Sequence, residues 1–159
     1  MTNSKKINLN DTLVREATLA DAEVIAEFNR AMAFETESHG LDKETVKNGV
    51  EAVFSQAGLG FYLIAERHSE TAGCLMVTKE WSDWRNGHYW WIQSVYVDQQ
   101  HRGNGLYRKM YDEVIKRAQL EGNVSEVRLY VEKDNTVAQA VYEKLGMENS
   151  GYLVYGVSL

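Results

Sequence analysis

A short glycine-bearing turn carries the clearest chemistry in this sequence. Residues 95–97 read Val-Tyr-Val, residues 98–105 read Asp-Gln-Gln-His-Arg-Gly-Asn-Gly, and a helical pattern begins at Leu106. Unpaired N–H groups at the start of a helix bind anions, and glycines let the backbone approach a phosphate. Arg102 and Arg108 add positive charge beside the turn. The pattern therefore predicts a phosphate-binding turn, although a plain strand-to-helix connection accounts for Gly-x-Gly alone equally well.

Two common phosphate-binding signatures do not fit this turn. The Gly-Lys-Ser/Thr ending of a Walker A loop is missing after Gly105. The third glycine of a Rossmann fingerprint is also missing, and the sequence offers no early βαβ unit.

A second candidate segment, residues 80–87, joins two tryptophans to two carboxylates. It contains Glu80, Trp81, Asp83 and Trp84. Indole faces attract cations, so the segment predicts a site for a cationic amine. A packing loop or a dimer surface remains the alternative interpretation.

The elements that must position these residues follow from hydrophobic spacing and capping residues. Strands are expected at residues 13–16, 61–66, 72–79, 88–97, 127–131 and 152–159. Helices are expected after the capping box Thr18 to Asp21, after Asp42, from Leu106 to Gln119, and after Asn135. The order β-α-α-β-β-β-α-β-α-β predicts an α/β fold with a mixed sheet flanked by helices. Residues 1–12 are expected to form a flexible lead-in, and residues 13–159 a single domain.

Composition narrows the functional classes. The 159 residues are 44% hydrophobic and carry a net charge of −6, which disfavours a nucleic-acid partner. No apolar run approaches the ~18 residues of a membrane span, and the polar start is not a secretory signal, so a cytoplasmic protein is expected. Cys74 is the single cysteine and is expected in the core. No Cys/His cluster has zinc spacing, so no metal is expected.

Two segments together resemble the GCN5-related N-acetyltransferases (GNAT). Residues 100–105, Gln-His-Arg-Gly-Asn-Gly, match the Gln/Arg-x-x-Gly-x-Gly/Ala motif of that family. Residues 135–146 match its second motif, Asn-x-x-Ala-x-x-x-Tyr-x-x-x-Gly. The resemblance extends over residues 13–159. It implies the GNAT fold with a mixed, mostly antiparallel central sheet, and acetyl-CoA as cosubstrate with its pyrophosphate in the glycine turn.

The resemblance also implies which residues contact the cofactor. The strand at residues 95–97 splays from its neighbour, pairs with the pantetheine arm and offers a backbone N–H to the oxyanion; a core strand is the alternative. The implied cofactor contacts are Val95, Tyr96, Val97, Arg102, Gly103, Asn104, Gly105, Leu106, Tyr107, Arg108, Asn135 and Tyr142. Tyr107 departs from the family, because many members carry a small residue there.

Tyr142 is the candidate that protonates the leaving thiolate. It lies seven residues after Asn135, so both side chains fall on nearly one helix face. A phenol with a pKa of about 10 is protonated at pH 7 and can donate to a thiolate. Packing alone for Tyr142, and helix capping alone for Asn135, are the alternatives.

The general base is less defined. Many relatives have a glutamate where this sequence has Gln93, and an amide cannot titrate. Another acceptor is then needed, and Glu35, Glu80, Asp83 and His88 are candidates, each of which could also be an ordinary solvated residue.

The sequence therefore predicts an N-acetyltransferase that moves the acetyl group of acetyl-CoA to a primary amine. The acceptor is expected to be a small molecule, polyamine-like compounds included, or an amino terminus, and the attack is direct. Glu35, Glu80, Asp83 and Trp84 are the candidate acceptor residues. A non-catalytic CoA-binding module of the same fold is the alternative, and dimerisation is left open. No nucleic-acid or membrane partner is expected.

Overall fold

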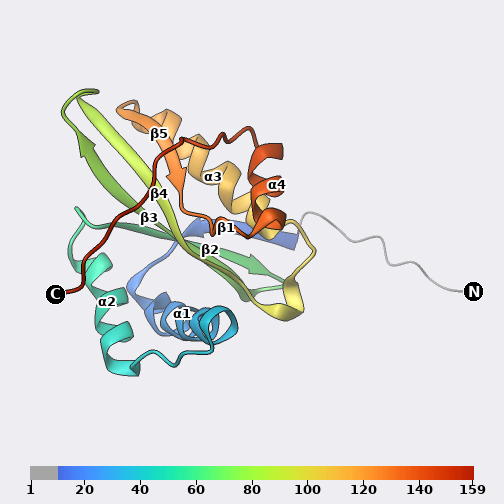
Figure 1. Ribbon diagram of the computed structural model, residues 1–159. Helices are drawn as coiled ribbons and strands as arrows, with labels where there is room; N and C mark the ends of the chain where they lie inside the picture. Colours follow the sequence, from blue (N-terminus) through green and yellow to red (C-terminus); the bar gives the residue numbers. More distant parts are fainter. Residues whose placement is uncertain (1–10) are drawn as a thin grey trace, which may run out of the picture. The chain divides into compact units, whose positions relative to one another are not determined.

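The computed structural model describes residues 11–159, so residues 1–10 of the expected lead-in lie outside the described part (Figure 1). The chain divides into two compact units, Met1–Leu129 and Tyr130–Leu159. The first unit holds strands β1 (Thr12–Glu16), β2 (Gly60–Arg67), β3 (Glu70–Ser82), β4 (Gly87–Val97) and β5 (Val124–Leu129), and helices α1 (Ala22–Glu37), α2 (Lys43–Ser55) and α3 (Leu106–Glu121). The second unit holds helix α4 (Thr136–Lys144).

The five strands form one mixed sheet in the order β1-β2-β3-β4-β5. Neighbouring strands are antiparallel except for β4 and β5, which are parallel. The β2–β3 hairpin closes at His68 and Ser69, which both have positive φ, of 53° and 64°. Two such residues match the right-handed twist of the flanking strands, and they are the only residues between β2 and β3.

Helices α1 and α2 cover one face of the sheet (Figure 1). The buried residues Ile25 and Val50 pack with Tyr62, Ile64 and other residues that point to this face. The expected capping residues start both helices: Thr18 and Asp21 form a capping box before α1, and the Asp42 side chain accepts from Thr45 N–H at 2.8 Å before α2.

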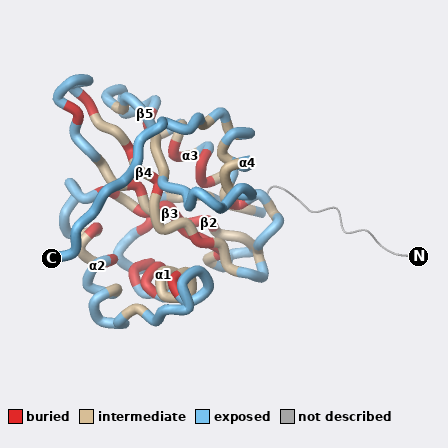
Figure 2. Tube along the Cα trace, viewed as in Figure 1, coloured by how far each residue is buried: buried red, intermediate tan, exposed pale blue. Residues whose placement is uncertain are grey.

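Helix α3 covers the opposite face. Its residues Leu106, Met110, Val114 and Ala118 are buried at four-residue spacing. Arg117 of the same helix lies over the ring of Phe61, whose side chain points away from α1. Figure 2 shows the buried residues concentrated in α1, α3 and the middle of the sheet.

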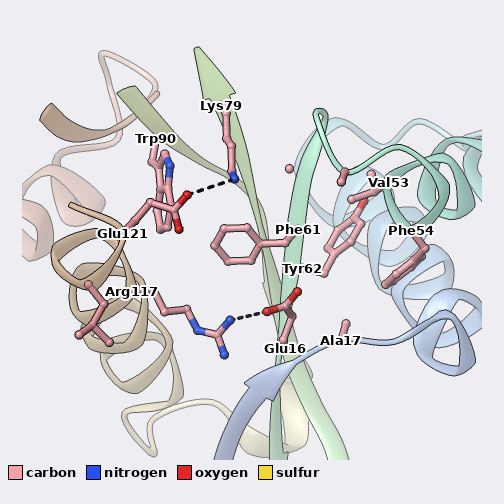
Figure 3. Close-up of a pocket in the computed structure, with 13 residues that line it drawn as sticks. Glu16, Ala17, Val53, Phe54, Phe61, Tyr62, Lys79, Trp90, Arg117 and Glu121 are labelled. Carbon is pink, nitrogen blue, oxygen red and sulfur yellow. Dashed lines mark hydrogen bonds and ion pairs between the residues drawn. The ribbon is translucent and has the colours of Figure 1, made fainter. Parts of the chain in front are cut away.

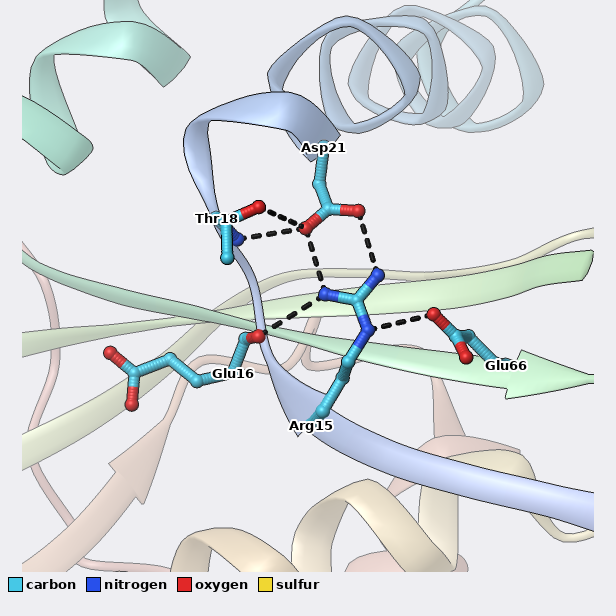
Figure 4. A network of polar contacts seen from close by, with 5 residues as sticks. All are labelled: Arg15, Glu16, Thr18, Asp21 and Glu66. Carbon is cyan, nitrogen blue, oxygen red and sulfur yellow. Dashed lines mark hydrogen bonds and ion pairs between the residues drawn. The ribbon is translucent and has the colours of Figure 1, made fainter. Parts of the chain in front are cut away.

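The connection from β1 to α1 is fixed by ion pairs around Arg15 (Figure 4). Its two Nη atoms donate to the two oxygens of Asp21, each at 2.8 Å, and its Nε donates to Glu66 at 2.7 Å. Asp21 Oδ2 also accepts from Thr18 N–H at 2.8 Å. Arg15 therefore joins the first two strands to the start of α1.

In the second unit Asn135 caps α4, because its side chain accepts from Ala138 N–H at 3.0 Å. The strand expected at residues 152–159 is wrong, since these residues belong to no strand and Tyr152 and Tyr155 are 82% and 88% exposed. A strand needs a neighbour for its N–H and C=O groups, and residues 130–159 contain no other strand. Within residues 11–159, none of the helices has the length and apolar character of a membrane span.

Candidate functional site

Strand β4 loses one of its two neighbours at Gln93. Its pairing with β5 ends at Ile92, so within residues 11–129 the stretch 93–97 pairs with β3 alone. A β-bulge falls in the same stretch, where the paired positions move from Met76 and Gln93 to Cys74 and Tyr96. The extra residue on β4 bends the strand and redirects the side chains that follow.

The open edge of β4 presents the backbone of Val97. Asp98 N–H donates to Ala72 O at 2.9 Å, which directs the Asp98 backbone toward β3. Because successive residues of a strand direct their polar groups to opposite sides, Val97 N–H and C=O face the edge that β5 leaves open, where the C=O accepts from Arg102 Nε at 2.9 Å. An extended ligand can pair with such an edge as an added strand.

The glycine turn follows β4 directly and leads into α3. Gly103 and Gly105 have φ of 76° and 72°, and a Cβ on either would meet nothing within 4 Å. The first hydrogen bond within α3 runs from Lys109 N–H to Gly105 O at 3.1 Å. The N–H groups of the first turn point toward the start of the helix, where the helix dipole adds partial positive charge. The arrangement suits a phosphate group.

Side chains within the turn hold it in shape. The Asn104 amide donates to the carbonyls of His101 at 2.9 Å and Arg102 at 3.1 Å. The Asp98 carboxylate accepts from Gln100 N–H at 3.0 Å. These bonds are internal to the turn, so they fix it without using the N–H groups at the start of α3.

Both arginines expected beside the phosphate form ion pairs with carboxylates. Arg102 Nη2 donates to Glu35 at 2.7 Å, and Arg108 Nε donates to both oxygens of Asp112 at 2.9 and 3.0 Å. Each carboxylate reduces the charge that its arginine offers to an anion. The backbone N–H groups therefore carry the anion-binding character of the turn.

Gln93 lies at the start of the open stretch of β4. Its Nε2 donates to Thr78 Oγ1 on β3 at 2.6 Å. Neither group can take up a proton from an ammonium near pH 7. Cys74 on the neighbouring strand is fully buried, and burial raises the pKa of its thiol to about 12, so the expected core position is confirmed.

The candidate acceptor residues do not gather at one point. The Trp91 indole N–H donates to Glu80 at 3.1 Å, and Arg128 of β5 lies 4.0 Å from the same carboxylate. Trp84 is 92% exposed at the tip of the β3–β4 hairpin, where Asp83 is also exposed. Glu35 lies instead in the last turn of α1.

The other aromatic residues of the hairpin are already paired. Trp81 packs edge-on against His88 at 5.0 Å between ring centroids. The Arg128 guanidinium stacks 3.7 Å from the Tyr89 ring and donates to Glu126 at 2.9 Å. The structure thus contains a cation–aromatic arrangement here, but the cation is a side chain of the protein.

Tyr142 and Asn135 belong to the second unit, on α4 and at its cap. Partial burial raises the pKa of the Tyr142 phenol, so the hydroxyl is protonated across the neutral range. Near pH 7 the phenol therefore carries its proton, as a general acid requires.

A groove of about 550 Å³ lies within the first unit, between the ends of α2 and α3 (Figure 3). It is lined by aromatic rings such as Phe61 and Trp90. Two ion pairs also line it: the charged atoms are 2.5 Å apart in Glu16–Arg117 and 4.0 Å apart in Lys79–Glu121. None of the residues predicted for the site lines the groove. In residues 11–159, no group of three or more His, Cys, Asp or Glu side chains is placed to hold a metal ion.

Sequence reasoning missed two residues that shape the site. Ser94 takes a positive φ of 50° in the bulge, and Arg128 stacks against the hairpin from β5. A bulge and a contact between distant segments leave no local pattern, so the sequence offered no signal for either.

Comparisons with known proteins cover most of the chain. The acetyltransferase (GNAT) family matches over residues 22–147. This chain belongs to the GNAT acetyltransferase family. A possible acetyltransferase from Clostridium difficile 630 is 37% identical, with a TM-score of 0.87 over 93% of this chain and 97% of that chain. These matches confirm the family, the class of enzyme and the α/β fold expected from the sequence.

Two further relatives are less informative, because one match is short and the other has low sequence identity. Mycothiol acetyltransferase of Kocuria rhizophila is 42% identical over 57 residues, which are 36% of this chain and only 18% of that protein. A predicted acetyltransferase from Clostridium acetobutylicum, solved with acetyl-CoA, is 18% identical, with a TM-score of 0.73 over 91% of this chain and 96% of that chain. The second likeness bears on the fold alone.

Proposed function

We propose that this protein transfers the acetyl group of acetyl-CoA to a primary amine, by direct attack without an acyl-enzyme. The acceptor is a small molecule, polyamine-like compounds included, or an amino terminus. The observation that carries the proposal is that two elements suited to CoA, an open strand edge and a glycine turn, follow one another at the end of β4. The Val97 N–H at the open edge suits an amide carbonyl of a pantetheine arm, and the positive end of the α3 dipole after Gly105 suits its pyrophosphate.

Different residues of this chain would contribute to different steps of the acetyl transfer. Acetyl-CoA supplies the thioester, whose carbonyl carbon is attacked by the neutral amine as the C–S bond breaks. A backbone N–H of residues 95–97 stabilises the negative charge on the carbonyl oxygen. The Tyr142 hydroxyl donates a proton to the departing sulfur. The proton released by the attacking nitrogen leaves through water, because the amide of Gln93 cannot accept it.

Thermal unfolding tests cofactor binding. Acetyl-CoA at about 100 times its Kd should stabilise the native state by about 2.7 kcal/mol, which raises Tm by roughly 5–10 °C. Gly103→Glu should remove the shift, because it places a carboxylate where the phosphates bind. Gly122→Glu is the matched control, since Gly122 has φ of 79° and equally open surroundings at the other end of α3. The control should lose stability but keep the shift.

Catalysis is tested by thiol release from acetyl-CoA across a panel of primary amines. Release that depends on the amine supports the transferase. A thermal shift without release from any amine would instead favour the non-catalytic CoA-binding module. An unchanged Tm at saturating acetyl-CoA would contradict both functions.

A further inference from the structure

The carboxylate of Glu35 gathers three groups from the segment that joins β4 to the glycine turn. Its Oε1 accepts from the Tyr96 hydroxyl at 2.8 Å and from the Gln99 amide at 3.1 Å. Its Oε2 accepts from Arg102 Nη2 at 2.7 Å. One acidic side chain of α1 therefore contacts the end of β4, the residues after it, and the residue before Gly103.

Arg102 is directed toward α1 and not toward α3. Its guanidinium lies 5.5 Å from the centre of the Tyr96 ring, and its Nε donates to Val97 O at 2.9 Å. Tyr96 in turn packs against Phe28 of α1, with ring centroids 5.1 Å apart. The side chain of Arg102 is thus used within the protein, on the sheet face that α1 covers.

The same contacts make Glu35 a poor base. The Arg102 guanidinium, with the hydroxyl of Tyr96 and the amide of Gln99, holds the pKa of this carboxyl below its usual range. A carboxylate with a lowered pKa has little tendency to take a proton from an ammonium. Its three hydrogen bonds instead connect α1 to the end of β4 and to the glycine turn.

We propose that Glu35 is a positioning residue for cofactor binding. Through Tyr96, Gln99 and Arg102 it holds the end of β4 and the glycine turn in the arrangement that receives the phosphates. The inference rests on the proposed function, because it assigns the turn to acetyl-CoA. Glu35 itself does not contact the cofactor.

Two effects of Glu35 on the affinity for CoA have opposite signs, which makes the proposal testable. Removing a negative charge near an anion site should, by electrostatics alone, tighten the binding of CoA. Removing a contact that fixes the turn should weaken CoA binding, because the entropy cost of ordering the turn then falls on the binding step. The proposal requires the second effect to prevail.

The experiment measures the Kd of CoA by calorimetry for the wild type and for Glu35→Gln. We expect the variant to raise Kd by about threefold or more, the scale of a partly exposed ion pair. Glu37→Gln makes the same change of charge on an exposed residue of the same helix, and its Kd should equal that of the wild type. A Kd for Glu35→Gln equal to or below the wild-type value would overturn the proposal.

Steady-state kinetics separates positioning from catalysis. Glu35→Gln should raise KM for acetyl-CoA while kcat at saturating acetyl-CoA stays near the wild-type value. A fall of kcat with an unchanged KM would make Glu35 part of the chemistry and sink the inference. Tyr96→Phe keeps the ring and removes one bond to Glu35, so it provides a milder variant with the same expected direction.

A double-mutant cycle checks the route through Arg102. If Glu35 acts through this residue, the variant with both Glu35→Gln and Arg102→Gln should bind CoA no more weakly than Arg102→Gln alone. Additive losses would contradict that route. A wild-type protein that does not bind CoA would refute the proposed function itself, whereas wild-type binding with an unaffected Glu35→Gln refutes this inference only.

Discussion

Replacing Asp21 by Asn should destabilise the fold by about 2 kcal/mol. The Asp21 carboxylate accepts from both Nη atoms of Arg15 and from Thr18 N–H, all at 2.8 Å, and its side chain is only 11% exposed. An asparagine keeps one of the two oxygens, so one charge-assisted bond is lost and an N–H donor is turned toward the guanidinium. A hydrogen bond to a charged group contributes about 1.5–3 kcal/mol, which sets the magnitude.

Urea unfolding followed by tryptophan fluorescence measures this loss, and Tm should fall by roughly 4–8 °C. Asp112→Asn is the control, because Asp112 also accepts two bonds from one arginine, but its side chain is 55% exposed. An exposed pair of this kind contributes about 0.5 kcal/mol or less. Equal losses in the two variants would refute the argument that burial makes the Arg15 network strong.

The effect should also depend on pH. Arg15 holds the pKa of Asp21 below its usual value in the folded state. A lowered folded pKa gives stabilisation that is present above the unfolded pKa and is lost as pH falls through the folded pKa. The difference in unfolding free energy between wild type and Asp21→Asn should therefore be full at pH 7 and shrink below about pH 4. A constant difference down to pH 2 would exclude the charge as its source.

Three further outcomes are expected. Tyr142→Phe should lower kcat by ~10–10³-fold with little change in the Kd of CoA, the range of general-acid catalysis; an unchanged kcat would leave protonation to water. Trp84→Ala should raise KM for the amine several-fold and leave KM for acetyl-CoA unchanged; loss of a dimer in light scattering instead would make the hairpin tip an interface. Cys74, with a pKa of about 12, should resist iodoacetamide at pH 8 in the native protein and react in urea.

Local chemistry made most of the fold predictable. Asp42 and Asn135 cap the helices expected after them, and Gly122 ends α3 in a left-handed conformation. Pairing between strands is less visible in sequence. β5 begins at Val124 rather than Val127, and the alternating residues from Tyr152 onward form no strand, because strand formation depends on a partner that residue types do not reveal.

The candidate site was likewise predictable only where local residue types determine the structure. The glycine turn could be predicted because a positive φ and a helix start demand particular residue types at fixed positions. The partner of Arg102 could not, since Glu35 precedes it by more than sixty residues and becomes its neighbour only when α1 packs on the sheet. Three of the four candidate acceptor residues, Glu80, Asp83 and Trp84, were grouped because they are close in sequence, and a hairpin spreads such residues over two faces and a tip.

The short turns of the sheet have a consequence for how the protein folds. Strands β2, β3 and β4 are joined by connections of two and four residues, 68–69 and 83–86. Strand β1 reaches β2 only after residues 17–59, and β5 reaches β4 only after residues 98–123. Closing these long connections costs about 2 kcal/mol more chain entropy than closing the four-residue turn. We therefore expect the three-strand meander to form early, with β1, β5 and the helices between them docking onto strands that are already paired.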